Sequence, residues 1–172
     1  MLIVSFTGAS PWSVLAQGIS LNVDFSIGTI TLFVSIGVLL LWIPLKQKPG
    51  IGTILNALII AAMIDICIKF VPTPVGYYSQ LILAIIAVLT VGLGGGIYLV
   101  ANLGAGPRDG LMVGLQKKTN LPIAAVRAFL EISAVSIGWY LGGTVGPGTL
   151  LFAFGIGPAV ALSLYLVGKI FS

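Results

Sequence analysis

The sequence contains no histidine, one cysteine and very few charged residues. Charged side chains make up 7% of the 172 residues, whereas a soluble domain has about 25%. These shortages exclude a Ser-His-Asp triad, a metal site built on histidine or cysteine, and an internal disulfide. The net charge of +4 is too small and too scattered for a nucleic-acid-binding surface. We therefore expect no metal, no cofactor, no nucleic-acid partner and no enzymatic activity.

Apolar residues dominate the rest of the chain. They make up 58% of it, and the mean hydropathy is +1.18. A membrane-spanning helix needs about 20 mainly apolar residues. We therefore predict an all-α polytopic membrane protein, with the lipid bilayer as its surroundings. Five runs are long enough for full transmembrane helices, and they cover residues 26–45, 53–71, 81–103, 122–141 and 149–171.

The chain repeats itself at an offset of 96 residues. Residues 8–11 (Gly-Ala-Ser-Pro) align with residues 104–107 (Gly-Ala-Gly-Pro), and residues 50–53 align with residues 146–149 through the pattern Gly-x-Gly-Thr. A shared apolar composition would not align glycine, proline and threonine at turns, so we infer an internal duplication. A complete repeat has three spans. Because three is an odd number, the second repeat crosses the membrane in the opposite direction to the first. The sequence thus predicts two inverted three-helix repeats.

The two repeats are expected to form a single transmembrane domain, residues 1–172, with a first repeat at 1–71 and a second at 72–172. The counterpart of the span 81–103 would lie before residue 1. We therefore expect the first repeat to lack its opening span and the apolar residues 1–6 to be the end of a truncated helix. A homodimer or a partner membrane protein is expected at this place, and the alternative is a start codon further upstream.

Each repeat also holds a short helix after its Gly-Ala-x-Pro turn. Pro11 and Pro107 fit the first helical position, where no intrahelical N–H is needed. The simpler interpretation is a pair of interfacial helices on the membrane surface. The alternative is a pair of re-entrant helices whose N-termini point at a solute. Gly157 and Pro158 interrupt the last span near its middle and predict a kink there.

Basic residues fall mainly on one predicted side of the membrane. By the positive-inside rule, that side and the C-terminus are cytoplasmic. Trp42 and Trp139 lie near span ends, as expected of interfacial aromatic belts. The other side holds Lys69 alone. The basic side carries Lys46, Lys48, Arg108, Lys117, Lys118 and Lys169, with Arg127 close by.

Several motifs resemble those of a known family. Residues 48–56 read Lys-Pro-Gly-Ile-Gly-Thr-Ile-Leu-Asn, and residues 104–112 read Gly-Ala-Gly-Pro-Arg-Asp-Gly-Leu-Met. Together with Arg127 and Glu131, these stretches are similar to the bacterial YczE/YyaS/YitT-type integral membrane proteins, on the YczE side. The resemblance covers essentially the whole chain. It implies a multi-pass protein of the bacterial plasma membrane and does not specify a biochemical role.

Four charged residues lie within predicted spans, where charge is costly and usually faces protein or water. Arg127 and Glu131 are four residues apart, so both side chains lie on one helix face. Glu131 follows Pro122 by nine residues, which places it about 13 Å into the membrane. We take this pair as the candidate functional centre, with a purely structural ion pair as the equal alternative. Asp65 and Lys69 have the same spacing, and for them a structural pair is favoured.

Three further polar residues are secondary candidates for the functional site. Arg108 and Asp109 lie in the first turn of the second short helix, where Asp109 complements the helix dipole. Asn56 lies at the inner end of the second span. An asparagine in that place more often joins helices than binds a ligand.

Two functions fit these observations. The first is a small transporter for an unknown small solute, supported by the inverted repeats, the kinked last span and the ionisable pair. The alternative is an accessory protein that scaffolds a partner enzyme or transporter, supported by the lack of a large soluble domain and by glycine-rich packing faces. A water-accessible cavity at Glu131 would favour the first function, and a dry bundle with an exposed groove would favour the second.

Overall fold

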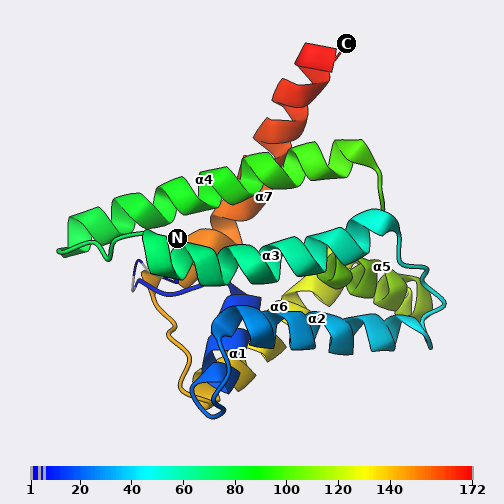
Figure 1. Cartoon of the computed structure of the whole chain (residues 1–172). Coiled ribbons are helices and arrows are strands. Elements are labelled where there is room, and N and C mark those ends of the chain that lie inside the picture. Colours follow the sequence, from blue (N-terminus) through cyan, green and yellow to red (C-terminus); the bar gives the residue numbers. More distant parts are fainter. Residues whose placement is uncertain (1, 4, 6, 172) are drawn as a thin grey trace.

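The computed structural model describes residues 2–171 apart from residues 4 and 6. The described residues form an all-helical protein with short turns between the helices (Figure 1). The prediction of an all-α fold is therefore confirmed. The helices in chain order are α1 (Pro11–Ser20), α2 (Ile27–Trp42), α3 (Ile51–Phe70), α4 (Tyr77–Ala101), α5 (Pro107–Thr119), α6 (Ile123–Tyr140) and α7 (Pro147–Phe171).

Four of the described helices are long and apolar enough to cross a membrane, namely α3, α4, α6 and the 21-residue segment Pro147–Val167 of α7. They match four of the predicted spans in place and order. The fifth expected span, residues 26–45, forms the shorter helix α2. Its 16 residues reach about 24 Å at 1.5 Å per residue. A polytopic membrane protein is therefore supported, with α2 shorter than the sequence predicted.

Helix α2 ends at Trp42 because of the residues that follow it. Pro44 has no amide hydrogen, and its ring would clash with the carbonyl of Leu40 in a continued helix. The chain turns instead, and Lys46 adopts a left-handed conformation with a φ of 53°. Pro44 thus ends the helix, although it lies within the apolar run of residues 26–45 that predicted a full span.

The helices form two groups. In the first group, α1 and α5 each pack against both α2 and α6, and α3 lies against α2 and α5. In the second group, α4 packs along α7. In the view of Figure 1, α4 lies above α3, and α7 rises from the level of α3 past α4 to the top. The two short helices therefore each pack against two helices of the first group. Their placement on the membrane surface or within it stays a prediction.

The first group is centred on Trp42. Its side chain is 3% exposed and packs against Leu111 of α5. The indole Nε1 donates a hydrogen bond to the carbonyl of Pro107 at 2.9 Å. Gly110 leaves room for the ring, since a Cβ there would lie 1.9 Å from Trp42 Cζ2. The structure thus places Trp42 in the protein interior instead of an interfacial belt, whereas Trp139 is 69% exposed.

Helices α4 and α7 approach closely along a line of small residues. A Cβ on Gly92 would lie 2.3 Å from the Cβ of Ala159, and one on Gly96 would lie 2.2 Å from Ser163 Oγ. Ser163 Oγ also donates a hydrogen bond to the carbonyl of Leu93 at 2.9 Å. Close contact between small residues is a common way for membrane helices to associate.

Two turns fasten the short helices to the long ones. Before α5, the carbonyl of Leu103 accepts a hydrogen bond from the amide of Gly52, in the first turn of α3, at 2.9 Å. Before α1, the carbonyl of Thr7 accepts one from the amide of Gly148, in the first turn of α7, at 2.7 Å. The two contacts occupy equivalent positions, because Leu103 follows Thr7 and Gly148 follows Gly52 by 96 residues.

Both turns require a glycine. Gly8 and Gly104 have φ values of 110° and 118°, a backbone conformation that L side chains rarely adopt. Space is restricted as well. A Cβ on Gly8 would lie 2.6 Å from the backbone nitrogen of Gly146, and one on Gly104 would lie 2.9 Å from the Cα of Gly50.

Two expected features of the chain ends differ in the structure. Helix α7 runs without interruption through Gly157 and Pro158, so these residues do not end the helix, and a bend there stays a prediction. In the stretch 1–6, the described residues form turns instead of the end of a helix, and Leu2 packs against α4. Met1, Val4 and Phe6 lie outside the described residues.

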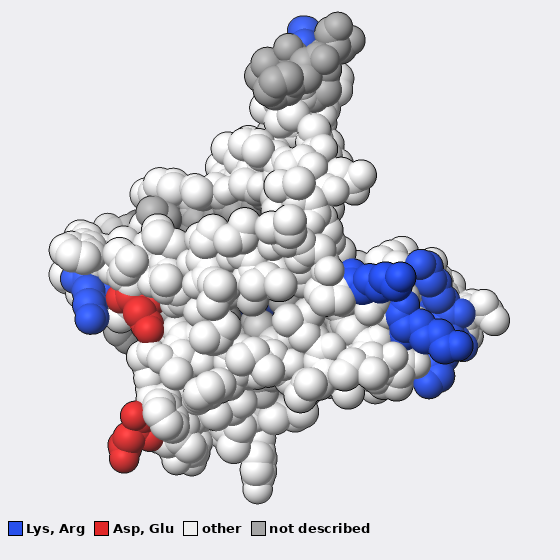
Figure 2. All heavy atoms as spheres, turned by 45° about the vertical axis from the view of Figure 1, so that its right-hand side comes forward, with Lys and Arg blue, Asp and Glu red and all other residues white. Residues whose placement is uncertain are grey.

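Basic side chains gather at one end of the molecule in Figure 2, and the visible acidic side chains lie at the opposite end. The turn after α2 and the end of α5 are neighbours at the basic end, because Gly114 of α5 packs against Leu45 and Gln47. Helix α7, which carries Lys169, ends at the top of the view in Figure 1, apart from this basic end. The lysines of the two neighbouring segments are Lys46, Lys48, Lys117 and Lys118.

We expect Gly110→Ala to destabilise the protein, because its Cβ would overlap the indole ring of Trp42. Overpacking of this kind typically costs about 1–3 kcal/mol, which thermal unfolding of the purified protein in detergent would show as a lower midpoint. Gly37→Ala in α2 is the matched control, since nothing lies within 4 Å of its Cβ. The control should keep or raise the midpoint, because alanine favours a helix over glycine. An unchanged midpoint for Gly110→Ala would contradict the tight contact.

Candidate functional site

The two short helices begin next to each other inside the first helix group. Trp12 and Arg108 are the second residues of α1 and α5. The guanidinium carbon of Arg108 lies 5.2 Å from the centroid of the Trp12 ring, which is a cation–π contact. Trp12 also packs against the apolar cluster around Trp42. Positions 12 and 108 are equivalent in the two sequence repeats, so the contact joins like positions.

From the contact between Trp12 and Arg108, each short helix runs toward the end of another helix of the first group. Asn22, just after α1, donates a side-chain hydrogen bond to the carbonyl of Leu141, just after α6, at 2.9 Å. The side-chain oxygen of Gln17 in α1 accepts one from the backbone amide of Thr144 at 2.9 Å. Helix α5 passes the turn that follows α2, against which Gly114 packs. The starts of α1 and α5 are therefore central, and their ends are peripheral.

The primary candidate pair forms within α6. Arg127 Nε donates to Glu131 Oε1 at 2.9 Å, and the two side chains are 43% and 22% exposed. Glu131 stands at the middle of the 18-residue helix, as the sequence predicted. Within the described residues, this is the one pair of opposite charges at ion-pair distance. Its neighbour Leu130 packs against the cluster around Trp42, so this part of α6 borders the centre of the first group.

Four charges surround the start of α5. Arg108 is half-buried and close enough to Asp109 and Glu131 to interact with both charges. Asp109 interacts in the same way with Arg108 and Arg127. The structure thus brings the candidate pair of α6 together with two of the secondary candidates on α5.

Asn56 of α3 faces the same helix start. Gly106 precedes α5 and has no side chain. The place that its Cβ would take lies 3.1 Å from Asp109 Oδ2 and 3.5 Å from Asn56 Oδ1. In the part of the chain that the structure describes, no hydrogen bond or ion pair engages either of these two side chains. Asn56 therefore joins the site, although its position in the sequence favoured a role in helix packing.

Asp65 has a different role from the one expected. Its carboxylate accepts hydrogen bonds from Ser26 Oγ at 2.6 Å and from the amide of Gly28 at 2.8 Å. A carboxylate at a helix start satisfies free amides and complements the helix dipole. Among the described residues it forms no ion pair with Lys69, because it is engaged by the start of α2 instead. Asp65 therefore joins α3 to α2 and lies outside the site.

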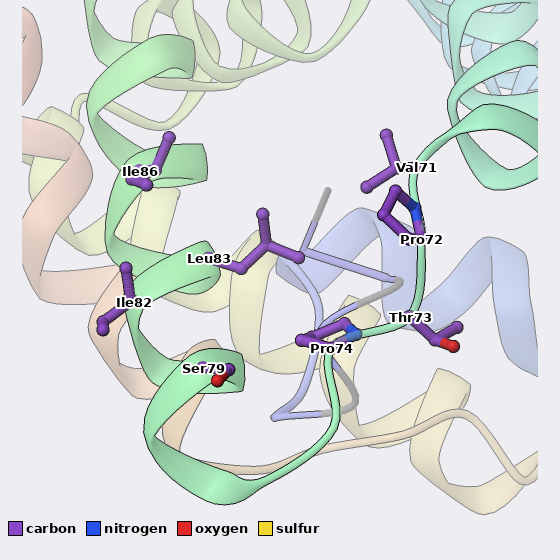
Figure 3. A pocket seen from close by; sticks show the side chains of 8 residues that line it. All are labelled: Val71, Pro72, Thr73, Pro74, Ser79, Ile82, Leu83 and Ile86. Carbon is purple, nitrogen blue, oxygen red and sulfur yellow. The ribbon is translucent and has the colours of Figure 1, made fainter.

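Two hollows lie beside α4. The larger, of about 410 Å³, lies between residues 71–74 and α4, and in Figure 3 Leu83 points from the helix toward the prolines of the turn. Its side chains are apolar except for Thr73 and Ser79, and none is ionisable. The smaller, of about 120 Å³, lies where α4 ends and the turn to α5 begins. Neither is lined by Glu131, so these two hollows give no support to the transport function over the accessory one. The smaller hollow is lined by Tyr98, Leu99, Asn102, Gly104 and Ala105.

Trp12 is the residue of the site that sequence reasoning missed. The available signal was its alignment with Arg108 at the repeat offset of 96 residues. Two residues at like positions of a duplicated chain come close when they lie near the axis that relates the halves.

The comparisons with known proteins agree with the resemblance found in the motifs. The family of unknown function DUF6198 matches residues 1–164. An uncharacterised protein of Haemophilus influenzae is 42% identical over 170 residues, which cover 99% of this chain and 78% of the relative. The uncharacterised membrane protein YczE of Bacillus subtilis is 31% identical over 160 residues, which cover 91% of this chain and 74% of YczE. The prediction of a YczE-like membrane protein is thereby confirmed. No solved structure matches the chain.

We expect Glu131→Gln to destabilise the protein, because it leaves Arg127 without its partner at the middle of α6. An arginine at the centre of a membrane helix costs about 3 kcal/mol, and the cost should be smaller for Arg127, which lies four residues before the middle of α6. Adding Arg127→Met removes both charges and should restore the thermal midpoint in detergent and the yield of inserted protein. A double variant as unstable as Glu131→Gln alone would show that the two side chains do not stabilise each other.

Proposed function

We propose that this chain, which belongs to the DUF6198 family and is similar to a bacterial membrane protein, moves a small solute across the bacterial plasma membrane. One observation carries this proposal. The starts of the two short helices meet through the side-chain contact of Arg108 with Trp12, and ionisable groups surround that point. Helix starts inside a membrane form the substrate sites of transporters with broken helices. The proposed activity needs no covalent chemistry, so no residue has a catalytic role.

The proposal includes two inverted repeats, residues 1–71 and 72–172. The paired turns before α1 and α5 support it, since each is bound by the first turn of a long helix from the other repeat. Side-chain packing supports it as well. Gly138 of α6 lies against Val14 of α1, and the equivalent positions, Trp42 of α2 and Gly110 of α5, lie against each other.

The proposed axis between the repeats passes near Trp12 and Arg108. Equivalent residues touch only where such an axis runs, and these two are in contact. The short helices α1 and α5 then enter from opposite sides of the membrane as re-entrant helices. In this arrangement the solute binds between the starts of α1 and α5, and the pair in α6 exchanges its internal contact for the solute.

We further propose that the lysine-rich end faces the cytoplasm and that the C-terminus lies inside, following the positive-inside rule. In a Cys67→Ala background, Lys117→Cys should resist an impermeant thiol reagent in intact cells and react after permeabilisation. Asp24→Cys, in the exposed turn between α1 and α2, is the control and should react in intact cells. Labelling of Lys117→Cys in intact cells would show that the lysine-rich end faces the outside of the cell.

Flux through the purified protein in liposomes, measured against a panel of small metabolites, tests transport itself. The wild-type protein should take up at least one solute faster than empty liposomes. The double variant with Arg127→Met and Glu131→Gln should insert normally and lose at least nine-tenths of that uptake rate. This loss corresponds to an increase in the activation free energy on the order of 1.4 kcal/mol or more. Full uptake by the double variant would leave the pair with a structural role only.

The flux measurement also distinguishes the transport function from the accessory function. A folded protein that moves none of the solutes would overturn the transport proposal. Co-purification with a partner membrane protein, or a dimer in detergent, would then support the accessory role.

A further inference from the structure

Four exposed lysines from two segments of the chain form a basic surface, which we call the lysine surface. Lys46 and Lys48 lie in the turn between α2 and α3, and Lys117 and Lys118 lie in the last turn of α5. Among the described residues, none of the four forms an ion pair. Basic side chains gather at this end of the molecule in Figure 2.

Packing of α5 on the turn holds the two segments together. A Cβ on Gly114 would lie 3.0 Å from Leu45 Cδ1 and 3.0 Å from Gln47 Cγ. Lys117 and Lys118 follow Gly114 by three and four residues, so they share its face of α5. That face is the one directed toward the turn. The four ammonium groups are therefore concentrated at one place, although about 70 residues separate the two segments along the chain.

The turn that carries Lys46 is fixed by its own hydrogen bonds. The amides of Leu45 and Gln47 both donate to the carbonyl of Trp42 at 3.1 Å, and the amide of Lys46 donates to the carbonyl of Ile43 at 3.1 Å. These amides are engaged within the protein. An anion at this turn would therefore be bound by the lysine side chains and not by the main chain.

The charge of the lysine surface is not balanced locally. Within residues 43–50 and 107–122, Asp109 is the one acidic residue. It precedes Lys117 by eight residues, which corresponds to about 12 Å along α5 at 1.5 Å per residue. Salt screens exposed charges beyond about 8–10 Å at physiological ionic strength. A positive-inside signal needs only an excess of basic residues on one side, whereas here the fold also gathers them.

The lysine surface lies next to the starts of two candidate spans. Lys48 precedes α3 by three residues, and Lys118 precedes α6 by five. Side chains this close to a span lie at the level of the lipid headgroups. Ile43 and Leu121, which adjoin the lysines, are exposed apolar residues. In a bilayer such apolar side chains contact acyl chains while lysine ammonium groups reach the headgroups.

We propose that the lysine surface binds the headgroups of anionic phospholipids. The negative phosphates complement the four ammonium groups, and the acyl chains complement the apolar residues beside them. Each basic residue near an anionic membrane surface strengthens the attraction roughly fivefold. This inference concerns lipid binding alone, so it does not depend on the transport of a solute.

Thermal unfolding of the purified full chain in detergent tests the surface. Phosphatidylglycerol or phosphatidylcholine with the same acyl chains is added at equal concentration. A lipid that binds the folded state raises the midpoint in a saturable manner. We expect phosphatidylglycerol to raise it by several degrees more than phosphatidylcholine at low salt. The difference should shrink at about 1 M salt, where the Debye length is about 3 Å. Equal midpoints in the two lipids at low salt would overturn the proposal.

Two sets of variants locate the lipid. Replacing all four lysines of the surface with glutamine should abolish the additional rise in phosphatidylglycerol, and the midpoint in phosphatidylcholine reports whether the variant still folds. Replacing the same four lysines with arginine keeps the charge and should keep the rise. The matched control combines Lys69→Gln with Lys169→Gln, two exposed lysines that lie outside the surface. The control should also keep the rise.

The remaining outcomes separate lipid binding from other effects of charge. A rise retained by the glutamine variant would place the lipid elsewhere and overturn the assignment. A rise lost in the control as well would show that net charge, and not this surface, determines the response. Glycerol phosphate carries the same phosphate without acyl chains, and at the same concentration it should not raise the midpoint. An equal rise with glycerol phosphate would identify a site for a free anion and overturn the lipid assignment.

Discussion

Backbone polar groups inside a membrane need partners within the protein, because lipid offers none. In the proposed arrangement, this constraint acts most strongly on the two turns that lead into α1 and α5. The carbonyls of Thr7 and Leu103 find partners in the first turns of α7 and α3. Those hydrogen bonds determine where each short helix starts, and hence where Trp12 and Arg108 meet. The geometry of the candidate site thus depends on main-chain groups that lie outside it.

Small residues serve two purposes in the packing. Between α4 and α7 they bring two helices close together, since Gly92 and Gly96 lie against Ala159 and Ser163. Association of this kind suits a membrane, where lipid tails compete with apolar side chains for contact. Next to Trp42, a glycine instead makes room for a large ring. Close backbone approach holds the second helix group together, and a buried aromatic ring anchors the first.

The sequence predicted those features that depend on local spacing. The i, i+4 separation placed Arg127 and Glu131 on one face of a helix, and the structure has that pair. The shorter α2 could also have been foreseen, because Pro44 cannot continue a helix. Features that depend on which helices are neighbours could not. Nothing near Asp65 in the chain indicates that its carboxylate binds the start of α2, 37 to 39 residues away.

The contact between Trp12 and Arg108 has a consequence for the proposed duplication. In a dimer of two identical half-length chains, a residue at the symmetry axis meets its own copy. Two arginines at that place would repel each other, and two tryptophans would lack a cation to pair with. A single fused chain is free of this restriction, because each half can change alone. Under the proposed duplication, the pairing of a cation with an aromatic ring at 5.2 Å is therefore open only to halves that differ in sequence, as the two halves of one fused chain can.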